Sequence, residues 1–200
     1  MKQIRLIAAA VVLAATALPA AAQQLSLGAL STYLNGLKTA QAEFTQINAD
    51  GTISTGTIYI KRPGRARFEY NPPEQTLVLA SAGQLAIFDA KSNTGPEQYP
   101  LARTPLNLIL AQNVDLGRNG MVVGHNYDGT ATTVTAQDPE HPEYGNIQLT
   151  FTGNPTELRQ WVITDDAGQQ TTVVLGELRK GGTISDRNFS IVAEAESRNR

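Results

Sequence analysis

Residues 56–70 read GTIYIKRPGRARFEY, and this stretch decides the fold of the chain. Apolar and polar side chains alternate on both sides of Pro63-Gly64, and successive strand side chains lie on opposite faces of a sheet. The second half places Ala66, Phe68 and Tyr70 on one face and Arg65, Arg67 and Glu69 on the other. Proline lacks the N–H that a central strand needs, so Pro63 marks a break between two strands. The stretch predicts neighbouring strands of an antiparallel sheet with one apolar face.

The same alternation places Arg62 on the apolar face, together with Ile58 and Ile60. A charge on such a face is costly unless it meets hydrogen-bond acceptors. A guanidinium has five donors and can satisfy several backbone carbonyls, such as those left free at the end of a short helix. The alternative is that the strand ends before Arg62 and the guanidinium reaches water, and the residues alone leave both open.

Alternating segments of strand type continue along most of the chain. They are expected at 41–48, 51–62, 65–70, 76–80, 84–90, 121–125, 131–137, 146–152, 157–164, 170–178 and 188–193. Turn sequences such as Gly153-Asn154-Pro155 separate them. No internal repeat or linker interrupts the pattern, which therefore predicts one antiparallel, sheet-rich domain.

Two leucine-rich segments have the spacing of helices. Leucines recur mostly every three or four residues between Leu25 and Lys38, and Thr104-Pro105 can begin a second, short helix that ends at Leu110. A single curved sheet of about ten or eleven strands leaves its concave face uncovered, and these helices are the candidates to cover it. The predicted fold is mainly β (α+β): an unclosed antiparallel β-barrel covered by an α-helical lid.

The first 22 residues have the layout of a secretory signal peptide. Two basic residues precede an apolar segment from Leu6 to Leu18, and Ala20-Ala21-Ala22 offers a small-residue cleavage site before Gln23. The apolar segment is shorter than the roughly 20 residues of a membrane-spanning helix, which argues against an uncleaved anchor. We expect a signal peptide over 1–22, one domain over 23–200, and export to the periplasm.

Composition narrows the possible functions. Without Lys2 and Arg5 of the signal peptide, the 16 Lys and Arg residues fall to 14 against 18 Asp and Glu, a formal net charge of −4. Nucleic acid is therefore not an expected partner, because phosphate binding needs a basic surplus. The absence of cysteine excludes disulfides, thiol nucleophiles and a lipid anchor on the chain itself. We expect a monomer without a cofactor.

Little in the sequence indicates catalysis. The chain has two histidines and neither a Gly-x-Ser-x-Gly motif nor a glycine-rich phosphate loop. The densest polar cluster is Asp138-Pro139-Glu140-His141-Pro142-Glu143, which offers Asp138, Glu140 and His141 to a metal or to a hydrolase mechanism. Two prolines in six residues predict an exposed hairpin loop instead. We therefore expect neither an enzyme nor a metal site.

Three segments resemble the periplasmic outer-membrane lipoprotein carrier protein family, LolA, in order and spacing. They are Phe44-Thr45-Gln46, the segment from Ile60 to Tyr70, and Thr104-Pro105-Leu106 followed by Leu108-Ile109. The resemblance implies a half-barrel under a helical lid. Its hydrophobic cavity would take the acyl chains of lipoproteins that an inner-membrane ABC transporter releases, and an outer-membrane receptor is a further partner to consider.

The resemblance also implies roles for single residues. Arg62 matches an arginine that bonds the lid and holds the empty cavity shut, and Ile109 matches a lid residue that faces the cavity. The predicted acyl-chain cavity consists of Leu30, Leu34, Phe44, Ile58, Ile60, Phe68, Leu77, Leu79, Leu106, Ile109 and Leu110. For any one of these residues, an ordinary filled core is the alternative. The chain departs from the family at Ala86 and Asn107, and it ends soon after Ile191.

Two functions remain as hypotheses. Burial of one CH₂ group is worth about 0.8 kcal/mol, so a long acyl chain prefers an apolar medium to water by on the order of 10 kcal/mol. The first hypothesis is therefore a carrier that shields the acyl chains of lipoproteins and shuttles them to the outer membrane. The second is another periplasmic lipid-binding or envelope-stress sensor domain on the same scaffold.

Overall fold

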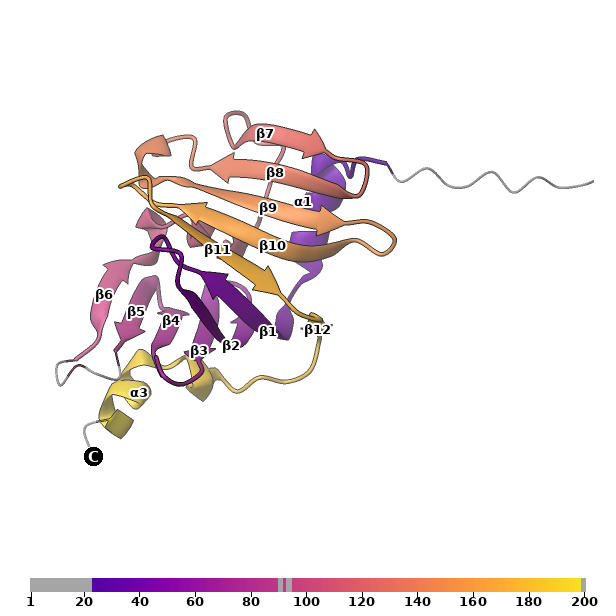
Figure 1. The fold of residues 1–200 in the computed structure, drawn as a ribbon. Helices are drawn as coiled ribbons and strands as arrows, with labels where there is room; N and C mark the ends of the chain where they lie inside the picture. Colours follow the sequence, from indigo (N-terminus) through magenta and orange to yellow (C-terminus); the bar gives the residue numbers. More distant parts are fainter. Residues whose placement is uncertain (1–22, 90–91, 93–94, 199–200) are drawn as a thin grey trace, which may run out of the picture.

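The structure is a computed structural model that describes residues 23–89, 92 and 95–198. The predicted signal peptide, 1–22, lies outside the described residues. The described chain forms one twelve-stranded sheet, with helices on both of its faces (Figure 1). This architecture confirms the predicted unclosed antiparallel sheet under helices.

Neighbours in the sheet are mostly neighbours in the chain. From edge to edge the order is β6-β5-β4-β3-β2-β1-β11-β10-β9-β8-β7, and β12 pairs with β1 beside this path. The strands are β1 (Thr39–Ile47), β2 (Ile53–Lys61), β3 (Arg65–Tyr70), β4 (Leu77–Ser81), β5 (Gln84–Phe88), β6 (Glu97–Pro100), β7 (Val122–Tyr127), β8 (Ala131–Gln137), β9 (Asn146–Thr152), β10 (Glu157–Thr164), β11 (Gln170–Leu175) and β12 (Arg179–Lys180). The pairing of β1 with β11 joins the first half of the chain to the second, and it is antiparallel.

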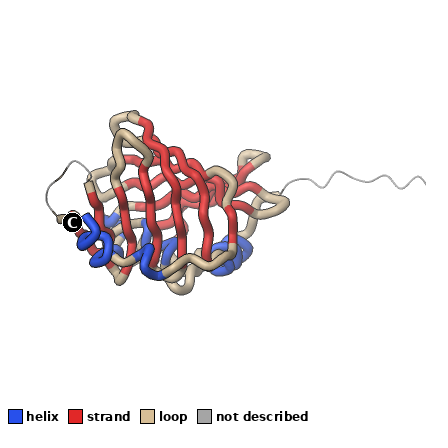
Figure 2. The backbone as a smooth tube through the Cα atoms, turned by 90° about the horizontal axis from the view of Figure 1, so that it is seen from below, coloured by secondary structure: helices blue, strands red, loops and turns tan. Residues whose placement is uncertain are grey.

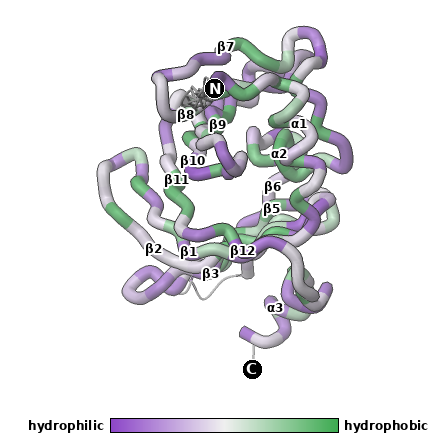
Figure 3. Tube along the Cα trace, turned by 90° about the vertical axis from the view of Figure 1, so that its right-hand side faces the viewer, coloured by the Kyte–Doolittle hydropathy of each residue, from purple (hydrophilic) through white to green (hydrophobic). Residues whose placement is uncertain are grey.

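The sheet is strongly curved, and its strands lie side by side around the concave face (Figure 2). Two helices, α1 (Leu27–Gly36) and α2 (Leu106–Leu110), lie on the concave side, while α3 (Ile191–Arg198) lies outside (Figure 3). The three short 3₁₀ turns are η1 (Leu101–Arg103), η2 (Pro142–Tyr144) and η3 (Asp186–Phe189). None of the helices in the described part of the chain has the length and apolar character that crossing a bilayer requires.

The predicted break at Pro63-Gly64 is confirmed. Strand β2 ends at Lys61 and β3 begins at Arg65, with Ile58 opposite Phe68 and Ile60 opposite Ala66. Gly64 adopts a φ of +70°, a left-handed conformation that glycine adopts without a steric penalty. The apolar side chains of both strands therefore share the concave face, as the alternation predicted.

Gly56 leaves room for an aromatic cluster on this face. It lies opposite Phe44 in the register of β1 and β2. A Cβ atom at this position would lie 2.1 Å from the Glu69 carbonyl oxygen and 2.8 Å from the Phe44 ring. The Phe44 ring in turn meets the Phe68 and Tyr70 rings edge to face, with centroid distances of 5.8 and 5.2 Å. Any larger residue at position 56 would displace this cluster.

The predicted strand at 188–193 is wrong, because this segment is helical. Ser190 accepts a hydrogen bond from Ala193 N through its side chain and one from Glu194 N through its carbonyl, which begins α3. Ile191 and Ala195 are four residues apart and lie on the same side of α3, against the sheet. Strand β6 was not predicted, because its four exposed residues show no apolar alternation.

The helix α3 covers the convex face of the first half of the sheet. Leu77, Leu79, Ala86 and Phe88 form a separate buried cluster beneath Ile191 and Ala195. The prediction that Leu77 and Leu79 line the concave cavity is therefore wrong. In the register of β3 and β4, Phe68 lies opposite Val78 and Ala66 opposite Ala80, so Val78 and Ala80 lie on the concave face. Strand β4 is apolar on both faces, and its sequence does not show which of its residues lie on the concave face of the sheet.

Charges fasten the C-terminal segment to the basic face predicted for β2 and β3. The Lys61 Nζ lies 2.6 Å from the Asp186 carboxylate, which also pairs with Arg65. Arg67 pairs with Glu194 at 3.2 Å. The hydrogen bond from Lys61 holds the pKa of Asp186 below its usual value. The basic face of the hairpin is thus occupied by the protein itself.

We expect Leu79→Ala to destabilise the fold strongly. Leu79 is 0% exposed, so truncation leaves a cavity and should lower the free energy of unfolding by about 2–5 kcal/mol. Urea unfolding followed by circular dichroism measures this change. The control is Val123→Ala, at a side chain that is 57% exposed, where the change should stay within about 0.5 kcal/mol. An equally small loss for both variants would show that α3 does not seal the convex face.

Candidate functional site

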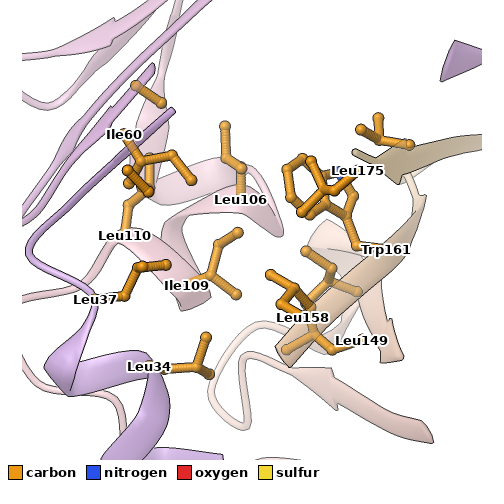
Figure 4. Packing of buried hydrophobic residues seen from close by; sticks show 14 of the residues in the cluster. Leu34, Leu37, Ile60, Leu106, Ile109, Leu110, Leu149, Leu158, Trp161 and Leu175 are labelled. Carbon is orange, nitrogen blue, oxygen red and sulfur yellow. The ribbon is translucent and has the colours of Figure 1, made fainter. Parts of the chain in front are cut away.

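The concave face of the sheet and the helices α1 and α2 enclose the main apolar cluster of the protein. Leu106 and Ile109 project from α2 among side chains of α1 and of both halves of the sheet (Figure 4). Nine of the predicted cavity residues are buried in this cluster: Leu30, Leu34, Phe44, Ile58, Ile60, Phe68, Leu106, Ile109 and Leu110. Leu77 and Leu79 lie on the other face of the sheet. The structure therefore brings together the predicted residues of α1, β1–β3 and α2.

A cavity of about 630 Å³ opens beside this cluster, at the N-terminal end of α2. Its apolar lining comes from both halves of the sheet and includes Phe68, Val78, Leu85, Leu106, Trp161 and Val173. Only Phe68 and Leu106 belong to the predicted set. The residues of β4, β5, β10 and β11 were missed because apolar alternation alone does not tell which strands face a hollow.

Aromatic rings form part of the cavity wall. The Phe68 ring of β3 meets the Trp161 ring of β10 edge to face, with centroids 6.4 Å apart. These two strands come from opposite halves of the sheet, so the contact spans the concave side. Trp161 is 1% exposed although it lines the cavity. Both rings offer apolar surface to a ligand.

The cavity also has a polar component. The Tyr70 hydroxyl donates a hydrogen bond of 2.7 Å to Gln46 Oε1, and both residues line the cavity. Burial raises the pKa of Tyr70 to about 12, so its hydroxyl stays neutral at physiological pH. Arg103 and Asp166 are exposed and line the cavity as well. The site is thus an apolar hollow with a polar margin.

Arg62 is buried at the opposite end of α2. Its side chain donates from Nη2 to the Ala111 carbonyl oxygen at 2.5 Å and to Asn35 Oδ1 at 3.3 Å. The residue is 8% exposed, which settles the alternative left open by the sequence: the guanidinium does not reach water. Burial lowers the pKa of Arg62. The guanidinium satisfies a carbonyl just after a short helix, which is one of the two alternatives that the residue pattern left open.

The bonding of Arg62 is incomplete. Its Nε and Nη1 atoms are buried without a hydrogen-bond partner among the described residues. Each unsatisfied buried donor costs on the order of 1–3 kcal/mol, and more in a charged group. The Arg62 side chain is therefore held by a strong bond to the Ala111 carbonyl, and the desolvation of the same guanidinium opposes its burial.

The backbone of the hairpin holds the same end of α2. Gly64 N donates to the Leu110 carbonyl of α2 at 2.8 Å. Arg62 N donates to the Lys38 carbonyl at 2.8 Å, which ties the hairpin to the residue just before β1. The last carbonyls of a helix have no partner within the helix, and here Leu110 finds its partner in the hairpin. The helix α2 is therefore fastened at its C-terminal end, while its N-terminal end borders the cavity.

The polar cluster at 138–143 lies in the connection between β8 and β9, and none of its residues lines the cavity, although the neighbouring Tyr144 does. Glu140 pairs with Arg118, and His141 pairs with Glu143 at 3.0 Å and stacks on Tyr144. Among the residues that the structure describes, no three His, Cys, Asp or Glu side chains are grouped so that they could hold a metal ion. Glu140, His141 and Glu143 of this loop thus form pairs at the protein surface.

Relatives of known name match most of the chain. An outer-membrane lipoprotein carrier protein from Cupriavidus taiwanensis is 26% identical over 196 residues, which cover 92% of each chain. The protein of the same name from Cupriavidus pinatubonensis is 28% identical over 186 residues, covering 87% of this chain and 84% of that protein.

A solved structure shares the fold. A DUF1329 family protein from Desulfovibrio piger matches with a TM-score of 0.50 at 13% identity, over 84% of this chain and 95% of that one. A LolA superfamily protein from Nitrosomonas europaea matches with a TM-score of 0.43 at 10% identity, over 83% and 98%. The family model of the outer membrane lipoprotein carrier protein LolA matches residues 35–192. This match confirms the resemblance carried by the three sequence segments, and the chain belongs to the LolA family.

Proposed function

We propose that this protein is a periplasmic carrier that shields the acyl chains of lipoproteins and shuttles them from the inner to the outer membrane. One observation carries the proposal: an apolar cavity is bordered by the N-terminal end of a five-residue helix whose far end is fastened by a buried guanidinium. Membership of the LolA family supports the same function.

The apolar cavity provides the burial that acyl chains require. Each long chain gains on the order of 10 kcal/mol on leaving water, which makes unaided crossing of an aqueous compartment negligible. A volume of about 630 Å³ lies within the range of about 300–1,000 Å³ that holds single small ligands. Cargo with more than one acyl chain needs additional space, and displacement of α2 would provide it.

The helix α2 is suited to move. It has five residues, from Leu106 to Leu110, and helices this short do not persist on their own in water. Its position therefore depends on packing against the apolar cluster and on the bonds from the hairpin at Arg62 and Gly64. The hydrocarbon of the cargo can replace the packing of α2 against the apolar cluster. Once the cargo has left, the bonds from Arg62 and Gly64 favour the return of the empty, closed state.

We assign the partners from this role. Acylated lipoproteins are the cargo, an inner-membrane ABC transporter loads them, and an outer-membrane receptor is a candidate acceptor. The protein would act as a monomer after removal of the signal peptide at 1–22, with 23–200 as its single domain. Cysteine is absent, so the carrier has no site for a lipid anchor of its own. Neither catalysis nor a cofactor forms part of the proposal.

Lipoprotein release from spheroplasts tests the function directly. Purified residues 23–200 added to spheroplasts should bring an outer-membrane lipoprotein into the soluble fraction as a complex with the carrier. Buffer alone should leave the lipoprotein in the membrane. If the purified protein contains phospholipid and never accepts a lipoprotein, the second hypothesis, a different periplasmic lipid-binding domain, replaces the first.

Arg62→Leu should load cargo and release it poorly. Loss of the bond to Ala111 destabilises the closed, empty state, and a hydrogen bond to a charged group is worth about 1.5–3 kcal/mol. Transfer from the loaded variant to acceptor membranes should fall about ten- to a hundredfold, since 1.4 kcal/mol corresponds to a factor of ten.

Arg65→Leu is the matched control for this experiment. Arg65 belongs to the same hairpin, but it pairs with Asp186 on the convex face. Its loss should leave loading and transfer close to those of the wild-type protein. Equal transfer by all three proteins would contradict the role of Arg62 as the residue that favours closure.

A further inference from the structure

Asn35, in the last turn of α1, connects three segments that meet at the C-terminal end of α2. Its Nδ2 donates to the Val114 carbonyl at 2.8 Å, and its Oδ1 accepts from Val114 N at 2.9 Å. The side-chain amide therefore bonds both backbone groups of one residue in the loop that follows α2. The same Oδ1 also accepts from Arg62 Nη2 at 3.3 Å.

The orientation of the Asn35 amide follows from these partners. Val114 N and Arg62 Nη2 are both donors, so the atom that faces them must be the oxygen. Rotation of the amide by half a turn would set Nδ2 against two donors and Oδ1 against the Val114 carbonyl. The backbone of Val114 thus fixes Oδ1 where it meets the guanidinium.

A second side chain of α1 holds the same loop one turn earlier. Ser31 Oγ accepts a hydrogen bond of 3.0 Å from Leu116 N. Ser31 and Asn35 are four residues apart and so lie on one side of the helix. Leu34, which lies between them in the sequence, is 1% exposed and anchors α1 in the apolar cluster. The helix α1 is therefore a fixed support for the chain that leaves α2.

We propose that Asn35 is a positioning residue for the closure of the lid: it holds the Arg62 guanidinium in line with the Ala111 carbonyl. This inference rests on the proposed role of Arg62. Two of the three nitrogens of Arg62 have no partner among the described residues, so the orientation of its side chain depends on the bonds of Nη2 alone. Without Asn35 Oδ1, one acceptor remains to hold it.

The sequence around Asn35 does not reveal this role. Asn35 lies between Leu34 and Gly36 near the end of a helix, a position where asparagine is usual for local reasons. Its partners are 27 and 79 residues away in the chain. Only the fold brings them together.

Backbone amide hydrogen exchange on the cargo-free protein tests the proposal. Gly64 N donates to the Leu110 carbonyl and does not bond Asn35, so it reports whether the hairpin still holds the lid. In Asn35→Ala, exchange at Gly64 should rise about tenfold, in line with the loss of one hydrogen bond. Exchange at Val114 rises in any case, because its acceptor is removed.

Two further variants complete the experiment. Thr32→Ala is the matched control on the same helix, because Thr32 bonds only the Gly28 carbonyl and should leave Gly64 unchanged. Asn35→Asp keeps the oxygen that accepts from Arg62 and Val114 N, while its second oxygen replaces Nδ2 and lies against the Val114 carbonyl, so the bond to that carbonyl is lost. At neutral pH this variant should keep Gly64 exchange within about threefold of the wild type, because charge-assisted bonds are stronger.

Asn35→Asp also keeps the test valid if Asn35→Ala does not fold. This variant loses the bond to the Val114 carbonyl and keeps the acceptor for Arg62, so it separates a role toward Arg62 from a role toward the loop alone.

Two results would overturn the proposal: slow Gly64 exchange in a folded Asn35→Ala, or a rise of Gly64 exchange in Asn35→Asp of about tenfold or more at neutral pH. These readouts need no cargo and are separate from the proposed function. A protein that accepts no lipoprotein but shows the expected Gly64 exchange would refute the carrier and support the role of Asn35.

Discussion

An open, curved sheet leaves an apolar concave face that its own strands cannot cover. The edge strands β6 and β7 lie at opposite ends of the strand order and do not pair with each other in the described structure. The concave side chains must therefore be covered by other elements, and α1 and α2 cover them. The two helices differ in length, with ten residues in α1 and five in α2. The longer helix is bound to the loop after α2 through Ser31 and Asn35, while the shorter one borders the cavity.

The balance at Arg62 connects this architecture to the proposed transport of acyl chains. A carrier must bury hydrocarbon strongly and still give it up, so its empty state needs stabilisation that cargo can offset. In the proposed carrier, a buried guanidinium with one strong bond, and with two nitrogens that have no partner among the described residues, would provide a closure of limited strength. Desolvation and hydrogen bonding oppose each other within a single side chain. In the proposed carrier, the apolar cavity would supply the affinity for cargo, and the polar contacts at the other end of α2 would supply the tendency to close.

Much of the fold could be predicted from sequence, because the local patterns are strong. Strands β3, β8, β9 and β10 have the bounds expected from their alternation. Arg62 is buried against the Ala111 carbonyl, one of the two alternatives that its position in the sequence left open. Prediction failed where alternation was ambiguous. Leu77 and Leu79 lie in a strand that is apolar on both faces, and 188–193 alternates although it is helical. The cavity wall at Trp161 and Val173, and the amide of Asn35, depend on contacts between segments far apart in the chain.

The most direct test of the account is whether hydrocarbon enters the cavity beside Trp161. Trp161 is the single tryptophan of the chain and lines the cavity, so its fluorescence reports on this site alone. The measurement is a titration with a lipopeptide whose acyl chains carry bromine, a contact quencher, against the same lipopeptide without bromine. The account predicts quenching of Trp161 that follows the bound fraction and appears only with bromine. Saturated binding with unchanged emission would contradict it, because the hydrocarbon would then lie elsewhere.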